Sequence, residues 1–430
     1  MKKLIPFAGV MIFSSLALAP AAAPVDSKRS SRPSSVDIAY AVAAERDGKL
    51  VLAGVSGHQG RRRMALARYT TRGRLDRTFG IGGKVLTSFG SGNAEARAVA
   101  VQADGKIVLA GALEPANGRG GFALARYTSR GRLDPSFGKG GRVVTHFGTG
   151  HSLSEAEAFA IQPDGKIVTV GSWYGSPIHG PVRFALARYT PRGRLDPSFG
   201  HGGKVLTSFG RRSDADARDV LIQPDGRLVV AGNGYSAVEL ARYRADGTLD
   251  RSFGHGGRVV AKLFRYGADA GGAVLQGDGK LVVNASEPDQ SFLVRYTADG
   301  KLDSSFGVDG KAVASKRYHV LGLLALQGTG RFIVAGSVIG GHGRAFAVHR
   351  HRPDGSVDSS FGQGGRVFTD FGSPASANAL TVQADDKIVV AGSSRFRDFA
   401  AARYTSTGRL DGSFGRGGKV TTDFGSGVNR

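Results

Sequence analysis

Short apolar runs alternate with glycine- and aspartate-rich breaks along almost the whole chain. One unit shows the order: residues 98–102 (AVAVQ), a turn at 103–105 (ADG), 106–111 (KIVLAG), a variable loop, 122–127 (FALARY), GRLDPSFG at 131–138, and 142–147 (RVVTHF). Runs of four to seven residues that are rich in Val, Ile, Phe and Tyr and bounded by Gly, Pro, Asp and Ser are typical of β-strands. No segment has helical periodicity. The pattern therefore predicts an all-β chain with four strands in each unit.

The unit recurs seven times, about every 56 residues, and its copies fill residues 36–430. An aspartate in the GRLDPSFG stretch marks each copy: Asp76, Asp134, Asp196, Asp250, Asp303, Asp358 and Asp411. Four strands in each of seven units predict a seven-bladed β-propeller with four antiparallel strands per blade. The alternative is a β-solenoid, whose coils are usually shorter. Copies five and six depart most from the pattern, at 308–310 (VDG) and 328–330 (GTG), so we expect less regular blades there.

The order of these segments, AVAVQxDGKIVxAG followed by FALARYTxxGxLDxSFGxxGxV, resembles the delta-60 repeat family of exported bacterial proteins. The resemblance covers essentially all of residues 36–430 and implies a β-propeller. It implies no catalytic residues.

The first 23 residues read as a signal peptide, because two lysines precede an apolar run that ends in small residues suitable for cleavage. Residues 24–35 would be a flexible linker. We therefore expect a secreted or periplasmic protein, monomeric and without a membrane span after cleavage. The chain has no cysteine, which excludes disulfides, thiolate metal sites and a lipid-modified cysteine.

Several residues that resemble catalytic or ligand groups are better explained by structure. An arginine eight residues before each recurring aspartate, such as Arg126 before Asp134, predicts an ion pair within each blade, since the guanidinium fork suits carboxylates. The glycine-rich stretches such as GKGGR at 138–142 lack the features of a phosphate loop and favour a sharp turn into the fourth strand. His349 and His351 would lie on one face of a strand, as exposed polar surface or as part of a metal site.

Four acids just ahead of the first strand of successive copies are candidate metal ligands: Glu95, Glu155, Asp216 and Asp269. In a propeller the first strand lies nearest the axis, so these carboxylates should gather at one mouth of the central channel. Such a partial ring suits Ca²⁺, which prefers several oxygen ligands. The alternative is that each acid bonds the backbone of its own loop.

The loops between the second and third strands should open on the same face, and their arginine and aromatic residues suit an anionic ligand. The chain carries a formal charge of +23, which attracts polyanions over long range. The alternative is that an arginine-bearing repeat was simply copied. The candidate ligand-binding residues are Arg61, Arg62, Arg63, Trp173, Tyr174, Arg183, Arg211, Arg212, Arg265, Arg395 and Arg397.

The first functional hypothesis is a non-enzymatic exported scaffold that binds an anionic polymer or an envelope component. The second is a propeller enzyme at the channel mouth, either a calcium-dependent lactonase or a quinone-dependent dehydrogenase. Its weakness is that only Asp219 offers a carboxylate within the predicted first strands. The third is a scaffold for protein partners, since the fold alone does not decide function.

Overall fold

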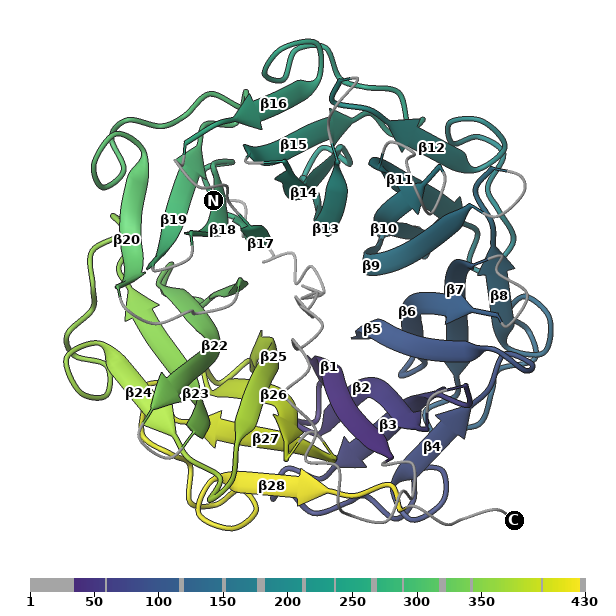
Figure 1. Cartoon of the computed structure of the whole chain (residues 1–430), viewed down its shortest axis with the longest axis vertical. Helices are drawn as coiled ribbons and strands as arrows, with labels where there is room; N and C mark the ends of the chain where they lie inside the picture. The colour runs from purple at the N-terminus through teal and green to yellow at the C-terminus, as the bar shows by residue number, and fades with distance from the viewer. Residues whose placement is uncertain are drawn as a thin grey trace, which may run out of the picture.

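The computed structural model describes residues 35–58, 60–115, 120–148, 152–175, 182–210, 214–235, 237–263, 269–287, 290–316, 322–340, 343–395 and 397–425. These residues form seven four-stranded antiparallel sheets arranged around one axis, which confirms the predicted seven-bladed β-propeller (Figure 1). No helix in these ranges is long and apolar enough to cross a membrane. The predicted signal peptide lies outside the described residues, as does the predicted linker except for Ser35.

Each blade consists of four consecutive strands, so no strand is exchanged between blades. Blades 1 and 2 contain β1 (Val36–Ala44), β2 (Leu50–Gly57), β3 (Arg63–Tyr69), β4 (Lys84–Thr87), β5 (Asn93–Val101), β6 (Ile107–Glu114), β7 (Gly121–Tyr127) and β8 (Arg142–Thr145). Blades 3 and 4 contain β9 (Leu153–Ile161), β10 (Ile167–Tyr174), β11 (Val182–Tyr189), β12 (Lys204–Thr207), β13 (Asp216–Ile222), β14 (Leu228–Gly234), β15 (Ala237–Tyr243) and β16 (Arg258–Ala261).

Blade 5 contains β17 (Asp269–Leu275), β18 (Leu281–Glu287), β19 (Gln290–Tyr296) and β20 (Lys311–Lys316). Blades 6 and 7 contain β21 (Leu323–Leu326), β22 (Phe332–Gly340), β23 (Gly343–His351), β24 (Arg366–Thr369), β25 (Ala375–Val382), β26 (Ile388–Ser394), β27 (Asp398–Tyr404) and β28 (Lys419–Thr422). The first strand of each blade lies nearest the axis and the fourth lies at the outer rim (Figure 1).

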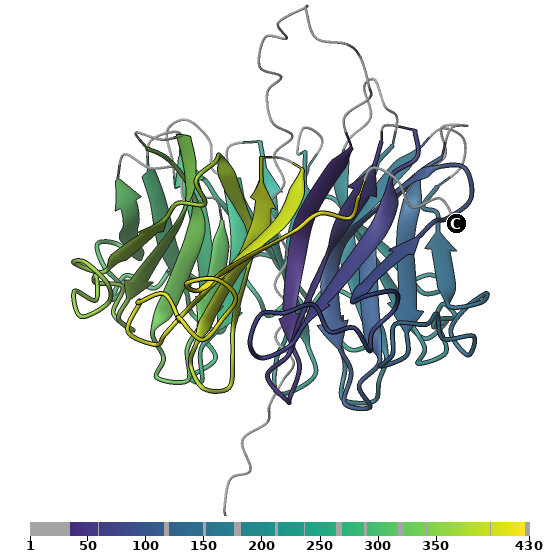
Figure 2. The same ribbon diagram turned by 90° about the horizontal axis from the view of Figure 1, so that it is seen from below.

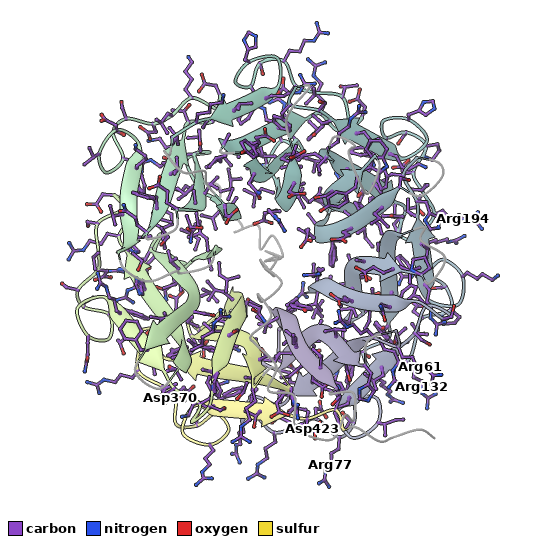
Figure 3. The ribbon with its side chains drawn as sticks, in the orientation of Figure 1. Arg61, Arg77, Arg132, Arg194, Asp370 and Asp423 are labelled. Carbon is purple, nitrogen blue, oxygen red and sulfur yellow. The ribbon has the colours of Figure 1, made fainter. Side chains whose placement is uncertain are left out.

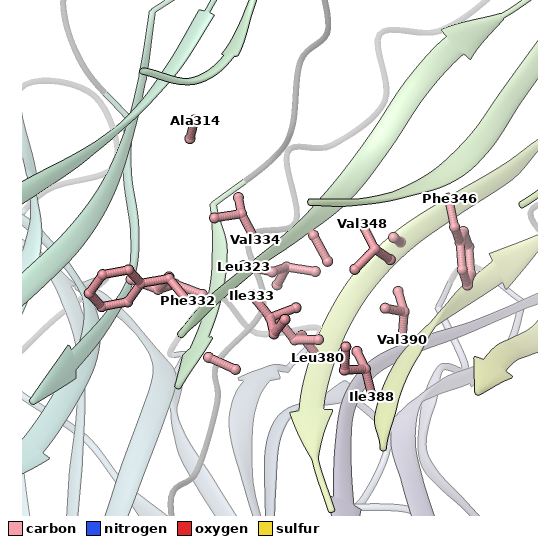
Figure 4. Packing of buried hydrophobic residues seen from close by; sticks show 14 of the residues in the cluster. Ala314, Leu323, Phe332, Ile333, Val334, Phe346, Val348, Leu380, Ile388 and Val390 are labelled. Atoms are coloured by element: carbon pink, nitrogen blue, oxygen red, sulfur yellow. The ribbon is translucent and has the colours of Figure 1, made fainter. Parts of the chain in front are cut away.

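The antiparallel order gives the propeller two different faces, seen at the two ends of the strands in Figure 2. On the loop face, each first strand begins and the second strand leads into the third. On the turn face lie the tight hairpins between first and second strands and the GRLDPSFG-type stretches. The core lies between neighbouring blades, where apolar side chains from facing sheets interdigitate, as for Phe332, Val348 and Leu380 in Figure 4.

The recurring arginine and aspartate form the predicted ion pair in all seven blades, with nitrogen–oxygen distances of 2.8–3.1 Å. In blade 2, the Arg126 Nε donates to Asp134 and its Nη2 donates to the Ser136 hydroxyl. The same guanidinium lies over the Phe137 ring, and this stacking also recurs in every blade, at 4.5–4.8 Å. The GRLDPSFG stretch is therefore a clamp that fastens the third strand to the fourth.

The clamp also joins neighbouring blades. The Arg126 Nη1 donates to the carbonyl of Pro191 in blade 3, and Gly131 of blade 2 packs on Phe79 of blade 1. A Cβ on Gly131, which has a φ of 79°, would lie 2.9 Å from the Phe79 ring, so only glycine fits this turn.

Hydrogen bonds between side chains link the outer parts of most blades. The tyrosine that ends the third strand donates to a threonine at the end of the preceding blade's fourth strand in blades 1, 2, 3, 4 and 7, at 2.6–2.8 Å. The bond from Tyr69 to Thr422 belongs to this set and joins blade 1 to blade 7. Two further hydrogen bonds cross the same junction. The Asn378 side chain donates to the carbonyl of Ala39, and the amide of Phe424 donates to the Asp37 carboxylate. Side-chain bonds of the repeating kind thus help to close the ring.

Blades 5 and 6 keep the common turns despite their different sequences. Asp309 adopts a φ of 49° where other copies have glycine, and Gly330 closes its hairpin with a φ of 76°. His349 and His351 are buried rather than exposed. Their Nδ1 atoms lie 3.1 Å from the carbonyl oxygens of Ala314 and Gly355.

Candidate functional site

Six of the seven first strands begin earlier than the sequence pattern predicts, and the same six carry a β-bulge. In β5, Ala96 pairs with Gly111 and Ala98 pairs with Ala110, which leaves Arg97 as the extra residue. A bulge re-aims the side chain of the extra residue and often lies beside a functional site. The extra residues are Tyr40, Arg97, Glu157, Arg218, the Gly271–Gly272 pair and Asn378.

The bulge explains the glycine that ends the KIVLAG-type run. A Cβ on Gly111 would lie 1.9 Å from the carbonyl oxygen of Glu95, and one on Gly171 would lie 1.9 Å from that of Glu155. Any larger residue would have to displace the bulged strand. The recurring glycine of the second strand thus positions the polar residues of the first.

Bulge residues of neighbouring blades contact one another around the axis. The Arg97 guanidinium lies 4.7 Å from the centre of the Tyr40 ring, and the Arg218 Nη1 lies 3.8 Å from the Glu157 Oε1. Blades 5 and 6 continue the ring with backbone alone, where the amide of Gly272 donates to the carbonyl of Gly322. We call the polar part of this ring in blades 1–4, together with the acids beside it, the axial cluster: Tyr40, Glu95, Arg97, Glu155, Glu157, Asp216 and Arg218.

Three of the four predicted acids belong to the axial cluster. Glu95 accepts from the Arg62 Nη1 at 2.8 Å and lies 3.1 Å from the Arg97 Nη2. Asp216 accepts from the Ser172 hydroxyl at 2.7 Å and from the Tyr174 hydroxyl at 3.4 Å. These two acids therefore bind side chains rather than only the backbone of their own loops.

Glu155 has a different environment. It forms no hydrogen bond or ion pair with any residue that the structure describes, although its strand neighbour Glu157 lies close enough to interact electrostatically. Burial and then the negative charge of Glu157 raise the pKa of Glu155 to about 7. The carboxyl group is therefore half protonated near neutral pH.

The fourth acid, Asp269, is exposed at the start of β17, and no described contact joins it to the other three. Among the described ranges, no group of three or more His, Cys, Asp or Glu side chains has the arrangement of a metal site. Calcium binding at these acids stays a prediction.

The structure describes eight of the eleven loop-face candidates. Arg61, Arg62 and Arg63 line a pocket of about 550 Å³ beside His58 and Gly425, at the junction of blades 1 and 7. Arg395 and Arg397 are exposed on the corresponding loop of blade 7, and Arg395 adopts a φ of 54°. Arg211, Arg212 and Arg265 lie outside the described residues.

Trp173, Tyr174 and Arg183 lie on blade 3. Trp173 donates through Nε1 to the carbonyl of Phe147 at 3.0 Å, and the Arg183 guanidinium lies 5.3 Å from the Trp173 ring centre. Arg183 also lines a groove of about 840 Å³ that continues to His255 and Arg258 in blade 4. Trp173 and Arg183 thus contact each other, so less of the surface of either side chain is accessible to a ligand.

A second arginine-rich surface lies on the turn face. In blades 1–3 the turn after the third strand reads Arg-Gly-Arg, and its arginines are exposed: Arg72, Arg74, Arg130, Arg132, Arg192 and Arg194. Their guanidinium groups form no ion pair or hydrogen bond within the described part of the chain. Arg132 and Arg194, with the exposed Arg77, extend outward from the rim (Figure 3). We call these seven residues the rim arginines.

Sequence reasoning missed the rim arginines and Arg97, Glu157 and Arg218. Comparison of the copies could have found the rim arginines, because blades 4–6 have Asp-Gly in the same turn. The bulge residues stand five residues before the Gln that follows the first strand, and no single residue type recurs at this position in all copies. Asp219, the predicted channel carboxylate, is instead 1% exposed and accepts from the amides of Val220 and Ala273, so it links blades 4 and 5.

A family model described as a β-propeller domain of unknown function (DUF5122) matches six segments of the chain: 45–79, 102–137, 162–199, 223–253, 276–306 and 383–414. Each segment runs from the hairpin after a first strand to the clamp of the same blade. The matches occur in every blade except blade 6 and support the predicted propeller repeat. No curated protein sequence matches the chain.

Solved structures similar to this one include three at 12% sequence identity. A streptogramin B lyase matches with a TM-score of 0.47, over 84% of this chain and 91% of its own. The BP39L lectin of Burkholderia pseudomallei matches with a TM-score of 0.45, over 90% of this chain and 100% of its own. A puromycin-hydrolyzing peptidase of Mycobacterium tuberculosis matches with a TM-score of 0.47, over 87% of this chain and 53% of its own. At this level of similarity none of them indicates what this chain binds.

Proposed function

We propose that this chain, a β-propeller repeat protein, is an exported scaffold that binds a linear anionic polysaccharide along the rim of blades 1–3. The observation that carries the proposal is that the fold does not need the rim arginines. Blades 4–6 build the same turn with Asp246, Asp299 and Asp354 in place of the first arginine. In both forms the turn glycine packs on the phenylalanine of the preceding blade, as Gly131 and Gly300 do.

The rim arginines have no internal charge to neutralise. The clamp arginines are paired with aspartate in every blade, and the lysines of the first hairpins lie within 4 Å of their own turn aspartates, as Lys106 does at 3.1 Å from Asp104. Exposed guanidinium groups repeated from blade to blade give a row of positive charge. Such a row attracts a polymer with repeated carboxylate or sulfate groups.

The composition of the rim favours a polysaccharide over single-stranded nucleic acid. Proteins that bind single strands combine positive charge with exposed aromatic rings for base stacking. In the described part of blades 1–3, the large apolar side chains that are exposed are Ile81, Val144 and Leu206, and none of them is aromatic.

The test compares two variants that each lose three positive charges. One changes Arg74, Arg132 and Arg194 to Gln, and the matched control changes Arg244, Lys301 and Arg352 to Gln in blades 4–6. If each rim contact contributes about 0.2–1 kcal/mol, the rim variant should bind heparin or polygalacturonate roughly 3- to 150-fold more weakly. Its affinity should also depend less on salt concentration.

Equal losses in the two variants would mean that only net charge matters, and the rim proposal would be wrong. A third variant, Arg61→Gln with Arg395→Gln and Arg397→Gln, tests the loop-face arginines. If that variant alone loses binding, the loop face is the binding surface. Tighter binding of an oligonucleotide than of either polysaccharide would replace the proposed ligand class.

A further inference from the structure

The pocket of about 550 Å³ on the loop face has a lining without apolar side chains. It is formed by the loop between β2 and β3, the connection from β4 to β5, and Ser35 and Gly425 from the two ends of the described chain. Every described residue that lines it is serine, glycine, histidine or arginine. Its volume lies in the usual range of small-molecule sites. The pocket therefore offers a small ligand charge and hydrogen bonds rather than apolar contact.

The pocket has more positive charge than its own acids neutralise. The Arg62 Nη1 donates to the Glu95 Oε1 at 2.8 Å, so one of its three guanidinium groups is paired. The guanidinium groups of Arg61 and Arg63 form no ion pair or hydrogen bond with any residue that the structure describes. No aspartate or glutamate is among the described lining residues. Two guanidinium groups of the pocket are thus left unpaired.

The acids at the junction of blades 1 and 7 do not neutralise these two groups. They are Asp37, Asp398 and Asp423. Burial raises the pKa of Asp37, which favours its uncharged form, and Asp398 interacts electrostatically with Arg395 and Arg397 of its own loop. Asp423 accepts from the Gly425 amide at 2.6 Å, and the Lys84 ammonium group donates to the Asp423 carbonyl at 3.0 Å. None of the three acids forms an ion pair with the unpaired arginines in the described part of the chain.

The loop that carries the three arginines is held in place by blade 2. The Arg62 amide donates to the Asn93 Oδ1 at 3.1 Å, and the Ala94 amide donates to the Arg62 carbonyl at 3.0 Å. The Arg61 amide donates to the His58 carbonyl at 2.9 Å, which closes a turn. The Arg62 Nε and the His58 Nδ1 are buried and have no hydrogen-bond partner among the described residues. Because the backbone is already positioned, a ligand that binds here orders only side chains, which lowers the entropic cost of binding.

We infer that this pocket binds a monosaccharide phosphate, with the phosphate group between Arg61 and Arg63. A phosphate monoester carries a charge between about −1.5 and −2 at pH 7 and three strong acceptor oxygens, which suits two unpaired guanidinium groups. The planar guanidinium fork also binds phosphate oxygens bidentately. A sulfate ester or a carboxylate carries only one negative charge and would leave one of the two groups without a counter-charge.

The rest of the lining favours a sugar ring as the group that carries the phosphate. Ser88 and Ser91 bring hydroxyl groups to the pocket, and these can donate to and accept from sugar hydroxyls. A nucleotide would need a flat apolar or aromatic surface for its base, and no Phe, Tyr or Trp is among the described lining residues. The pocket lies on the loop face, whereas the rim arginines lie on the turn face, so this inference does not rest on the proposed function.

The experiment uses the full chain and four probes: glucose 6-phosphate, glucose 6-sulfate, glucose and inorganic phosphate. Titration calorimetry at pH 7.5 should show the tightest binding for glucose 6-phosphate. Glucose 6-sulfate should bind about tenfold more weakly because it has one negative charge fewer. Inorganic phosphate should also bind about tenfold more weakly because it lacks the sugar hydroxyls. Glucose alone should not bind measurably.

Two variants test the residues. Arg61→Gln and Arg63→Gln should each weaken binding of glucose 6-phosphate about tenfold, because each removes charged donors to the phosphate. Each should also reduce the preference for the phosphate ester over the sulfate ester, which a merely structural role of the arginine would not change. Arg344→Gln is the matched control, because Arg344 is exposed at the start of β23 on the same face and lies outside the pocket lining. It should leave the affinity unchanged.

Three results would overturn the inference. They are no binding of glucose 6-phosphate, equal binding of glucose 6-sulfate or inorganic phosphate, and full affinity of the Arg61→Gln, Arg63→Gln double variant while its circular dichroism shows an intact fold. The variant Arg74→Gln, Arg132→Gln, Arg194→Gln should bind glucose 6-phosphate normally. Failure of this inference and failure of the polysaccharide proposal can therefore be told apart.

Discussion

Two of the seven junctions between blades lack the repeating tyrosine–threonine hydrogen bond, and restoring it between blades 4 and 5 should stabilise the protein. In five blades the fourth strand ends in a threonine that accepts a hydrogen bond from the tyrosine of the next blade. The fourth strand of blade 4 ends in Ala261 instead. Ala261 pairs with Val238 as Thr207 pairs with Phe184, so the two positions are equivalent. In blade 5 the Tyr296 hydroxyl is buried and has no partner among the described residues. The change Ala261→Thr would place a hydroxyl where the other blades have one.

The expected gain can be worked from the buried hydroxyl. Leaving a buried polar group unpaired costs about 1–3 kcal/mol, and a typical intramolecular hydrogen bond contributes about 0.5–1.5 kcal/mol net. Threonine also suits a strand better than alanine. We therefore expect Ala261→Thr to raise the free energy of unfolding by about 1–2 kcal/mol.

A double-mutant cycle with Tyr296→Phe measures the new bond directly, by urea unfolding followed through the fluorescence of Trp173. In the wild-type background Tyr296→Phe should be neutral or stabilising, because it removes an unpaired hydroxyl. In the Ala261→Thr background it should cost about 1 kcal/mol. Tyr243→Phe is the matched control and should destabilise the wild type, because it leaves Thr207 without its donor. The reasoning is refuted if Tyr296→Phe costs as much as Tyr243→Phe, or if Ala261→Thr is destabilising.

Three further predictions concern single positions. Burial lowers the pKa of His349 to about 4, so the unfolded state takes up a proton between about pH 6.5 and pH 4 that the native state does not. The free energy of unfolding should therefore fall by up to about 3 kcal/mol as the pH falls through that range. His349→Ala should make the free energy of unfolding depend less on pH. Gly171→Ala should lower the free energy of unfolding by about 1–3 kcal/mol in urea unfolding, because its Cβ meets the Glu155 carbonyl. Arg126→Lys should lower the free energy of unfolding by about 3 kcal/mol in the same assay, because lysine lacks the planar guanidinium group that pairs with the aspartate and stacks on the phenylalanine ring. Arg132→Lys, at an exposed position, should lower it by less than about 0.5 kcal/mol.

The fold could be predicted from the sequence because the repeat states the same pattern seven times. Where one copy departs from the pattern, the other copies still show where its strands and turns lie. The eight-residue interval between Arg126 and Asp134 recurs in every copy, which predicts the ion pair. The departures in blades 5 and 6 had little effect because the turn depends on backbone conformation. Asp309 can adopt the positive φ that glycine adopts elsewhere.

The axial cluster was only partly predictable, because its geometry depends on a register shift. A bulge changes which side of a strand faces the axis, and the sequence of β9 alone does not show that Glu157 is the extra residue. The burial of Asp219 and of His349 was likewise missed. Both are polar residues in strands, and their partners, the Ala273 amide and the Ala314 carbonyl, come from distant positions.

The positive charge of the chain is best understood by separating the charges that the fold uses from those that it does not. Each clamp contains one arginine and one aspartate, and six of the first hairpins pair a lysine or arginine with an aspartate, as in Lys166 with Asp164. Those charges cancel within each blade, so they contribute nothing to the net charge of +23. The surplus therefore lies in residues that differ between copies, such as Arg130 and Arg192, which Asp299 and Asp354 replace without loss of the turn. Copying of an arginine-bearing repeat accounts for the similarity of blades 1–3. It does not give the rim arginines a partner within the described part of the chain. An anionic partner outside the chain therefore explains these charges better than copying alone.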